Sequence, residues 1–270
     1  MVHLAIDIGA SSGRHIAAWR EGGSLKMQEV YRFSNLPQER EGHLIWDLDR
    51  LCREVVSGLA ACKEQGITPD SVGIDTWAVD YVLLDGEDRP ILPLYCYRDE
   101  RGAEGAELAH RVIPFEALYE RTGIQFQPFN TIYQLCWDRA HGRLEGAADF
   151  LMLPEYLSFY LSGVKAHEYT NASSTGLLDA RAKTWDTEII TALGLPERLF
   201  AAQPQRPPVK LGRLKEDIAR QVGFSCNVLL PATHDTASAI AALPQKGAYL
   251  SSGTWSLLGA ELPEPITTPA

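Results

Sequence analysis

The sequence lacks the cysteine pairs of a disulfide-linked or zinc-binding protein. It has five cysteines, an odd number, and no two of them are spaced as CxxC. We therefore expect reduced thiols in a packed core, no zinc site and a cytoplasmic location. The first residues, MVHLAIDIGA, also lack the basic and long apolar segments of a signal peptide.

Long apolar runs and basic runs are missing as well. No stretch approaches the roughly 20 apolar residues that cross a bilayer. The net charge is −10 and no Lys/Arg-rich segment occurs, which argues against nucleic acid or an anionic membrane as a partner. With 270 residues, 45% of them hydrophobic, the chain can fill the core of one large domain or slightly more.

Periodicity predicts an α/β chain in which helices pack on a sheet. Strands are expected at residues 3–8, 14–19, 25–33, 71–76, 79–84, 228–230, 248–252 and 254–258. Helices are expected from Asp47 to just before Gly66, and at residues 99–111, 114–121, 130–141, 154–162, 186–193, 212–222 and 236–243.

The GxxxxGK[ST] pattern of a P-loop is absent, so any phosphate cradle must be of another kind. A Gly- and Ser-rich turn at residues 9–13 connects two short apolar strands. Ser11, Ser12 and Arg14 offer hydroxyls, backbone N–H groups and a guanidinium, which together bind oxyanions. Asp7, beside the turn, could hold Mg²⁺ through water. The alternative is an ordinary hairpin turn whose N–H groups satisfy Asp7.

The segment VLLPATHDTASAI, residues 228–240, places a carboxylate where an apolar strand ends and a helix begins. Asp235 at that point is interpreted as a general base, because a helix N-terminus keeps a carboxylate ionised and kinases use aspartate to accept an alcohol proton. The alternative is a helix-capping aspartate, which stabilises by roughly 1 kcal/mol. His234 is interpreted as a structural neighbour.

Two further segments have both a functional and a structural interpretation. Residues 252–254, Ser-Gly-Thr, form either a second anion-binding turn or an ordinary one. Residues 75–80 place Trp77, expected to be exposed, between carboxylates. That combination is typical of sugar binding, and the alternative is a core tryptophan in a hairpin.

Seven motifs, taken in order, resemble those of the FGGY carbohydrate kinases. They are DIGASSGR, GIDTWAVDYVLLD, YRDER, TGIQFQPFNTIYQL, EYTNASSTGLLD, THDTASA and YLSSGTWSLLG. The resemblance implies the two-domain, actin-like ATPase (ribonuclease H-like) fold, with a mixed sheet flanked by helices. Within the family the motifs are most similar to those of the rhamnulokinase branch.

This resemblance implies ATP-dependent phosphorylation of L-rhamnulose at its 1-hydroxyl, with Mg²⁺, in rhamnose catabolism. Asp235 would be the catalytic base and Asp7 the aspartate linked to Mg²⁺. The residues that would contact ATP are Ala10, Ser11, Ser12, Gly13, Arg14, Gly253 and Thr254. Those that would contact the sugar are Trp77, Ala78, Val79, His234 and Thr236.

The sequence departs from the rhamnulokinase pattern in two ways. Ala78 stands where the branch usually has glycine, which keeps other ketoses such as L-fuculose or D-xylulose open as substrates. Residues 1–244 would form the N-terminal sugar-binding domain, and residues 245–270 only the opening hairpin of a truncated C-terminal domain.

A truncated second domain has consequences for activity and association. Domain closure would be impaired, so we expect weak or no turnover by this chain alone. The exposed apolar surface would favour self-association. The alternative is a non-catalytic sugar-binding module that remains after truncation.

Overall fold

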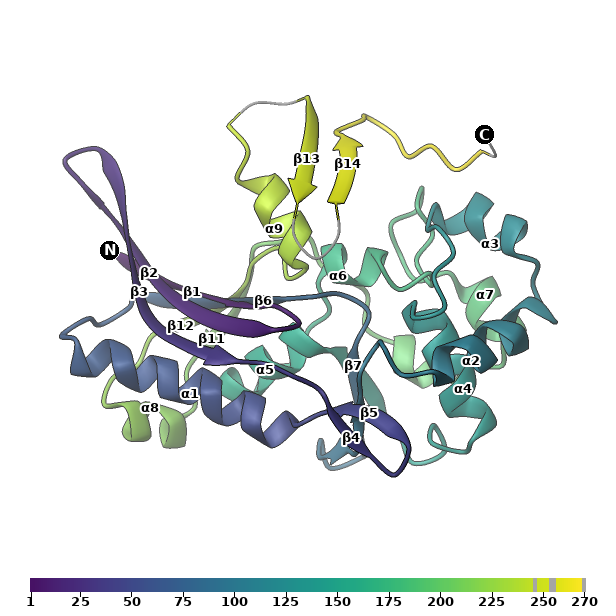
Figure 1. Cartoon of the computed structure of the whole chain (residues 1–270), viewed down its shortest axis with the longest axis horizontal. Coiled ribbons are helices and arrows are strands. Elements are labelled where there is room, and N and C mark those ends of the chain that lie inside the picture. The colour runs from purple at the N-terminus through teal and green to yellow at the C-terminus, as the bar shows by residue number, and fades with distance from the viewer. Residues whose placement is uncertain (245–246, 253–255, 269–270) are drawn as a thin grey trace.

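The computed structural model describes residues 1–244, 247–252 and 256–268. Its largest element is a six-stranded sheet with the order β11-β12-β6-β1-β2-β3, seen in Figure 1. Parallel pairing joins β12 (Asn227–Leu230) to β6 (Ser71–Thr76) and β6 to β1 (Val2–Ile8). Antiparallel pairing adds β2 (Ser12–Glu21), β3 (Ser24–Ser34) and β11 (Val209–Arg213). A mixed sheet with flanking helices confirms the expected fold class.

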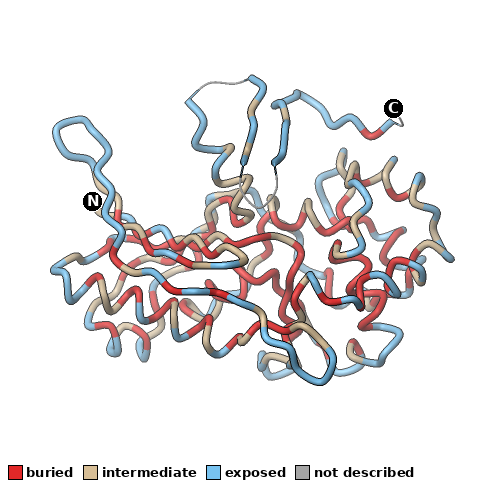
Figure 2. The backbone as a smooth tube through the Cα atoms, in the orientation of Figure 1, coloured by how far each residue is buried: buried red, intermediate tan, exposed pale blue. Residues whose placement is uncertain are grey.

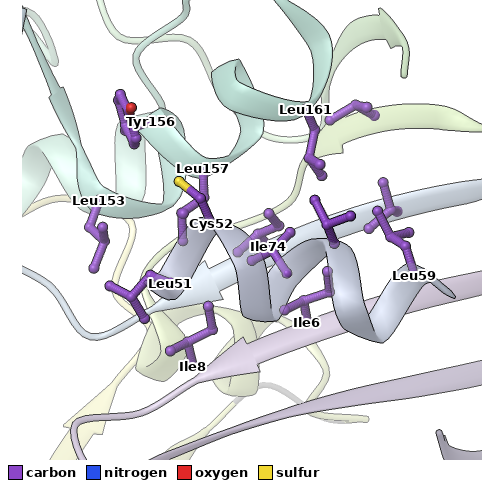
Figure 3. Close-up of a cluster of buried hydrophobic side chains, with 14 of the residues drawn as sticks. Ile6, Ile8, Leu51, Cys52, Leu59, Ile74, Leu153, Tyr156, Leu157 and Leu161 are labelled. Carbon is purple, nitrogen blue, oxygen red and sulfur yellow. The ribbon is translucent and has the colours of Figure 1, made fainter. Parts of the chain in front are cut away.

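Three helices cover one face of this sheet: α1 (Leu48–Glu64), α5 (Leu153–Ser162) and α8 (Glu216–Val222) (Figure 1). Helix α1 begins after Asp47, whose side chain accepts the backbone N–H of Arg50 at 2.8 Å. Figure 3 shows Leu51 of α1 beside Ile8 of the sheet, with Ile6 and Ile74 between Leu51 and Leu59. Burial of each such side chain contributes about 1.5–3 kcal/mol, so this contact fixes the helix on the sheet.

The five cysteines are all free and buried, as predicted. Cys52 lies among the leucines of α1 and α5 in Figure 3. Burial raises the pKa of its thiol to about 12, so this thiol stays protonated and acts as a small apolar side chain.

A second core lies in the helical half of the molecule. Around a three-stranded sheet of β10 (Asp149–Met152), β7 (Tyr81–Leu84) and β8 (Pro90–Ile91) pack α2 (Arg101–His110), α3 (Phe115–Thr122), α4 (Thr131–Ala140), α7 (Thr187–Ala192) and the 3-10 helix Glu197–Phe200. The Arg101–Asp138 ion pair, at 2.9 Å, is buried between α2 and α4. It ties these two helices together within the core.

The remaining elements are short. A small sheet contains β4 (Gln38–Arg40), β5 (His43–Trp46) and β9 (Leu94–Tyr95). Helices α6 (Tyr169–Ser173) and α9 (Asp235–Ala241) lie where the sheet meets the helical half (Figure 1). The hairpin of β13 (Ala248–Ser252) and β14 (Ser256–Ala260) stands clear of the body, and Figure 2 colours most of it as exposed.

Two predicted element boundaries were wrong. The helix expected at residues 212–222 begins only at Glu216, because residues 209–213 form β11 and pair with β12 at the sheet edge. The strand expected at 79–84 begins at Tyr81, because Val79 has a φ of +72°. In the described part of the chain, no helix combines the length and the apolarity that a bilayer crossing needs.

Candidate active site

Three aspartates lie at the carboxyl ends of adjacent parallel segments. Asp7 in β1 is the register partner of Asp75 in β6. Thr76, the next residue of β6, forms a parallel bridge with His234, which precedes Asp235. Register partners in parallel strands point to the same face of the sheet. The carboxyl ends of these strands therefore bring together carboxylates from three distant parts of the chain. Open α/β sheets place their sites at such strand ends.

The pKa of Asp75 is raised to about 8. Burial is the largest cause, and the negative charges of Asp7 and Asp235 add to it. A hydrogen bond with Ser238 and the charge of Arg14 oppose the rise. Burial and the two neighbouring carboxylates therefore both disfavour the charged form of Asp75, and a cation bound beside these aspartates would favour that form.

The aspartates at the carboxyl ends of these strands suit a Mg²⁺ ion that takes most of its ligands from water and phosphate oxygens. In the described residues, no group of three or more His, Cys, Asp and Glu side chains could hold a metal by itself. Mg²⁺ usually takes only one or two carboxylates and completes its shell with water and phosphate oxygens. Asp7 and Asp75 could supply those carboxylates, and the positive charge of the ion would oppose the rise in the pKa of Asp75 that burial and the two neighbouring aspartates cause.

Asp7 pairs with Arg14, whereas an ordinary hairpin turn would have satisfied it with backbone N–H groups. Arg14 donates to the Asp7 carboxylate through Nε at 3.0 Å and through a terminal nitrogen at 2.9 Å. The Arg14 side chain is 47% exposed, so the guanidinium can also reach a ligand outside the sheet edge. Asp7 and Arg14 thus present a carboxylate and a cation at one place.

The turn at residues 9–13 is held from behind by Asn35, which the sequence analysis missed. Asn35 donates its backbone N–H to the Ser11 carbonyl and its side-chain amide to the Gly9 carbonyl, both at 2.9 Å. Within the turn, the Gly9 N–H donates to the Ser12 carbonyl at 2.9 Å. Three carbonyl oxygens are therefore engaged inside the protein. That suits a cradle for an anion, which needs N–H groups rather than carbonyls facing it.

The other members of the turn differ in exposure. Ser11 is exposed and Ala10 and Ser12 are half-buried, so all three are within reach of a ligand. Gly13 is buried, and a β-carbon there would lie 2.2 Å from the Phe33 ring. Packing against Phe33 accounts for glycine at this position without a ligand.

Asp235 is the first residue of α9, and His234 is the N-cap. One carboxylate oxygen of Asp235 accepts the backbone N–H and the hydroxyl of Thr236, at 2.5 and 3.2 Å. His234 Nε2 lies 3.4 Å from the same oxygen, and burial lowers the pKa of its ring. The Asp235 side chain is 39% exposed, so a substrate hydroxyl can reach it. Asp235 is therefore not the capping residue of the structural alternative.

Trp77 is buried, contrary to the expectation of an exposed ring. Its indole is 7% exposed and lies 4.5 Å from the Trp46 ring. Both indole N–H groups donate to the same oxygen of Asp80, at 2.8 and 2.7 Å. Burial raises the pKa of Asp80 to about 6. The structural alternative of a core tryptophan describes these contacts better, and a direct contact between Trp77 and a sugar stays a prediction.

The two residues after Trp77 form a strained turn. Val79 has a φ of +72°, a region that β-branched residues rarely adopt. Its carbonyl accepts Thr131 Oγ1 at 2.9 Å and Gln134 Nε2 at 3.1 Å, which hold the turn in place. Val79 is buried and Ala78 half-buried, so Ala78 is the member of the turn that a sugar can approach.

The second predicted phosphate turn is only partly visible. Gly253 and Thr254 lie outside the described residues, so the roles predicted for them stay predictions. Ser252 and Ser256, on either side, end β13 and begin β14.

The hollow of about 500 Å³ on the surface lies elsewhere. It is lined by residues 38–49 of the β4–β5 region and residues 92–95, and includes none of the predicted site residues. Trp46 belongs to its wall and packs against Trp77 with the two rings tilted by 41°.

Sequence comparison relates the chain to sugar kinases. Residues 2–242 match the N-terminal domain of the FGGY family of carbohydrate kinases. The chain is 48% identical over 267 residues to a rhamnulokinase of Halalkalibacterium halodurans, covering 97% of this chain and 57% of that protein. It is 44% identical over 270 residues to a rhamnulokinase of Oceanobacillus iheyensis, covering 98% and 57%. The chain thus spans little more than half the length of these relatives.

Solved structures agree on the fold. A xylulose kinase from Lactobacillus acidophilus superposes with a TM-score of 0.81 at 18% identity, covering 95% of this chain and 53% of that one. A glycerol kinase from Plasmodium falciparum with ADP superposes with a TM-score of 0.76 at 17% identity, covering 95% and 53%. The likeness confirms the expected actin-like architecture. With the family match over most of its length, the chain belongs to the FGGY family of carbohydrate kinases.

Proposed function

We propose that these residues form the sugar-binding half of an ATP-dependent kinase that converts L-rhamnulose to L-rhamnulose 1-phosphate. The observation that carries the proposal is the convergence of Asp7, Asp75 and Asp235 at one edge of the sheet. The rhamnulokinase relatives, at 41–48% identity, support the choice of sugar.

In this proposal Asp235 takes the proton of the sugar 1-hydroxyl. The oxygen then attacks the γ-phosphorus of ATP, the bond between the γ-phosphorus and the β–γ bridging oxygen breaks, and ADP leaves. The turn at residues 10–14 would orient the phosphates, and Asp7 would hold Mg²⁺, which would supply positive charge against the phosphates. Most of the rate enhancement would come from this positioning and charge neutralisation.

The sugar would lie between the turn at residues 77–79 and the start of α9. Ala78, which is half-buried, would approach the sugar with its backbone, while His234 and Thr236 flank the proposed base. The methyl group of Ala78 narrows this side compared with glycine. It is therefore the position in this site that would most change the preference among ketoses.

Four further proposals concern the whole chain. Residues 1–244 form the sugar-binding domain, and residues 245–270 begin a second domain that would complete the ATP site with Gly253 and Thr254. The protein acts in the cytoplasm on soluble substrates, and the chain self-associates at high concentration. Because the chain spans 57% of its relatives, we propose weak turnover for it alone.

The test is binding and turnover with three ketoses. Titration calorimetry should show L-rhamnulose binding to the chain more tightly than L-fuculose or D-xylulose. ADP release in the presence of ATP and Mg²⁺ should follow the same order, at a low rate. A preference for another ketose would contradict the proposed substrate. Sugar binding with no ADP release at any enzyme concentration would favour a binding module.

A further inference from the structure

We propose that Glu168 is a positioning residue for the phosphoryl transfer, because its buried carboxylate fixes the strand end that carries Asp235. The inference rests on the proposed function. It adds a residue that touches neither the sugar nor ATP and acts through Thr233.

Glu168 is fully buried and accepts five hydrogen bonds with its carboxylate. Thr233 donates its backbone N–H at 3.0 Å and its hydroxyl at 2.7 Å. Thr170 donates the same two groups at 2.8 and 2.6 Å, and the Asn171 N–H donates at 3.4 Å. Hydrogen bonds to a charged acceptor are about twice as strong as neutral ones, so these contacts hold their donors firmly.

The donors on Glu168 connect it to two segments of the predicted site. The Thr233 carbonyl accepts the N–H of Thr76, the residue before Trp77, at 3.0 Å. The N–H of His234 donates to Thr170 Oγ1 at 3.4 Å. One carboxylate therefore joins α6, the end of β6 and the entry to α9. A small shift of any of these would move the base relative to the sugar turn.

Glu168 also has an electrostatic effect that can be measured. Burial lowers the pKa of His234, while the negative charges of Asp235 and Glu168 oppose this. Removing the charge of Glu168 should therefore lower the pKa of His234 further. Loss of helix stability alone would not produce this change.

The chain offers a matched control for the purely structural part of the role. Glu168 caps α6 by accepting the N–H groups of Thr170 and Asn171. Asp186 likewise caps α7 and is buried, and it also accepts two hydrogen bonds from Arg121, at 2.6 and 2.9 Å. Helix α7, which Asp186 caps, lies in the helical half, away from α9 (Figure 1). Losing the Asp186 cap should therefore cost stability without moving Asp235.

The experiment compares Glu168→Gln and Thr233→Val with Asp186→Asn. Glutamine turns an NH₂ group toward donors in either orientation, and valine removes the Thr233 hydroxyl while keeping its shape. We expect Glu168→Gln to lower kcat about ten- to hundredfold and Thr233→Val about tenfold, since small misplacements of a base have effects of this size. KM for the sugar should change less than about threefold, because neither side chain contacts the sugar and the displaced base affects the transfer step.

Two results complete the test. Thr233→Ser, which keeps both donors, should restore most of the kcat that Thr233→Val loses. Asp186→Asn should lower the melting temperature while leaving kcat within about twofold of the parent. Equal kcat losses in Asp186→Asn and Glu168→Gln would overturn the inference, as would full activity of Thr233→Val.

A readout without turnover separates this inference from the proposed function. NMR titration should show a lower His234 pKa in Glu168→Gln, and amide exchange at Thr236 should be faster in Glu168→Gln and Thr233→Val. Unchanged values in these variants would overturn the positioning role even in a chain that phosphorylates L-rhamnulose. A parent chain that phosphorylates no sugar but shows these changes would contradict the proposed function alone.

Discussion

The carboxyl group of Asp75 owes its raised pKa to residues far from it in sequence. Burial is the largest cause, and Asp7 and Asp235, which come from the two adjacent parallel segments, add to it. In the sequence Asp75 stood out only as a flank of Trp77. Its place in the site depends on strand register, which a single strand does not reveal.

Asp75→Asn should stabilise the chain at alkaline pH. The folded pKa of about 8 lies above the ordinary 3.8, so between these values the folded state holds a proton that the unfolded state has released. The associated stability is present below pH 3.8 and is lost as the pH rises through 8. We expect Asp75→Asn to gain about 1–2 kcal/mol at pH 9, allowing for solvent screening, and little at pH 4.

Urea unfolding of both proteins at the two pH values measures this difference. Addition of Mg²⁺ at pH 9 should reduce it, because the ion offsets the same charges. An equal gain in the free energy of unfolding at pH 4 and pH 9 would show that ionisation of Asp75 does not destabilise the folded chain.

Asp235→Asn should abolish turnover and leave sugar binding nearly intact. Removing a general base typically costs about 10²–10⁴ in rate, while asparagine keeps the size of the side chain and its hydrogen bond from Thr236. ADP release measures the loss, and calorimetry with L-rhamnulose should give a Kd within a few-fold of the parent. Retained turnover would rule Asp235 out as the base.

At the scale of helices and strands, the sequence predicted the elements that carry strong periodicity. Helix α1 was found from its apolar face and the aspartates of its first turn, and β1, β6 and β12 from short apolar runs. Elements stabilised by distant partners were missed. The four-residue β10 forms because it pairs with β7, and α6 spans only five residues and is capped by Glu168.

For the candidate site, the sequence likewise indicated the residues that have a local signal and missed those that depend on distant contacts. Asp7, Asp235 and the turn between β1 and β2 follow from local sequence and the family motifs. Asn35 lies outside those motifs, and Glu168 begins one of them but received no role, because the contacts of both residues join segments that are distant in sequence. Trp77 was assigned the wrong exposure, since its burial depends on Trp46 in β5 and on Asp80.

Gly13→Ala should destabilise the pairing of β2 with β3. The added methyl group would lie 2.2 Å from the Phe33 ring, and overpacking of this kind costs about 1–3 kcal/mol. Urea unfolding measures the loss. Gly86→Ala is the control, because nothing lies within 4 Å of a β-carbon there. Equal stability of the two variants would mean that Phe33 moves aside freely.

At the scale of the whole molecule, Mg²⁺ with ATP should stabilise the folded chain. A ligand that binds only the folded state at 100 times its Kd adds about 2.7 kcal/mol. We expect a rise in melting temperature with ATP and Mg²⁺ that EDTA reverses and that Asp7→Asn largely loses. A rise of the same size in Asp7→Asn would remove Asp7 from the metal site.

The β13–β14 hairpin should promote self-association. Leu250 and Leu258 are register partners, and they are 64% and 81% exposed. Exposed apolar side chains on a two-stranded sheet with open edges favour contact with another copy. Light scattering across a concentration series should show a growing mass for the parent and less growth for the double variant Leu250→Ser, Leu258→Ser. Equal masses would place the contact elsewhere.

The shared acceptor of the two adjacent indoles, whose rings are tilted by 41°, offers a fluorescence signal for the site. Trp46 and Trp77 both donate to Asp80, and Trp77 borders the turn that a sugar would approach. Tryptophan emission responds to nearby charge and to ring geometry. The fluorescence of this pair should therefore change as a ketose fills the site. Comparing the parent with Trp46→Phe isolates the signal of the pair, which would let the occupancy of the sugar site be followed without any added label.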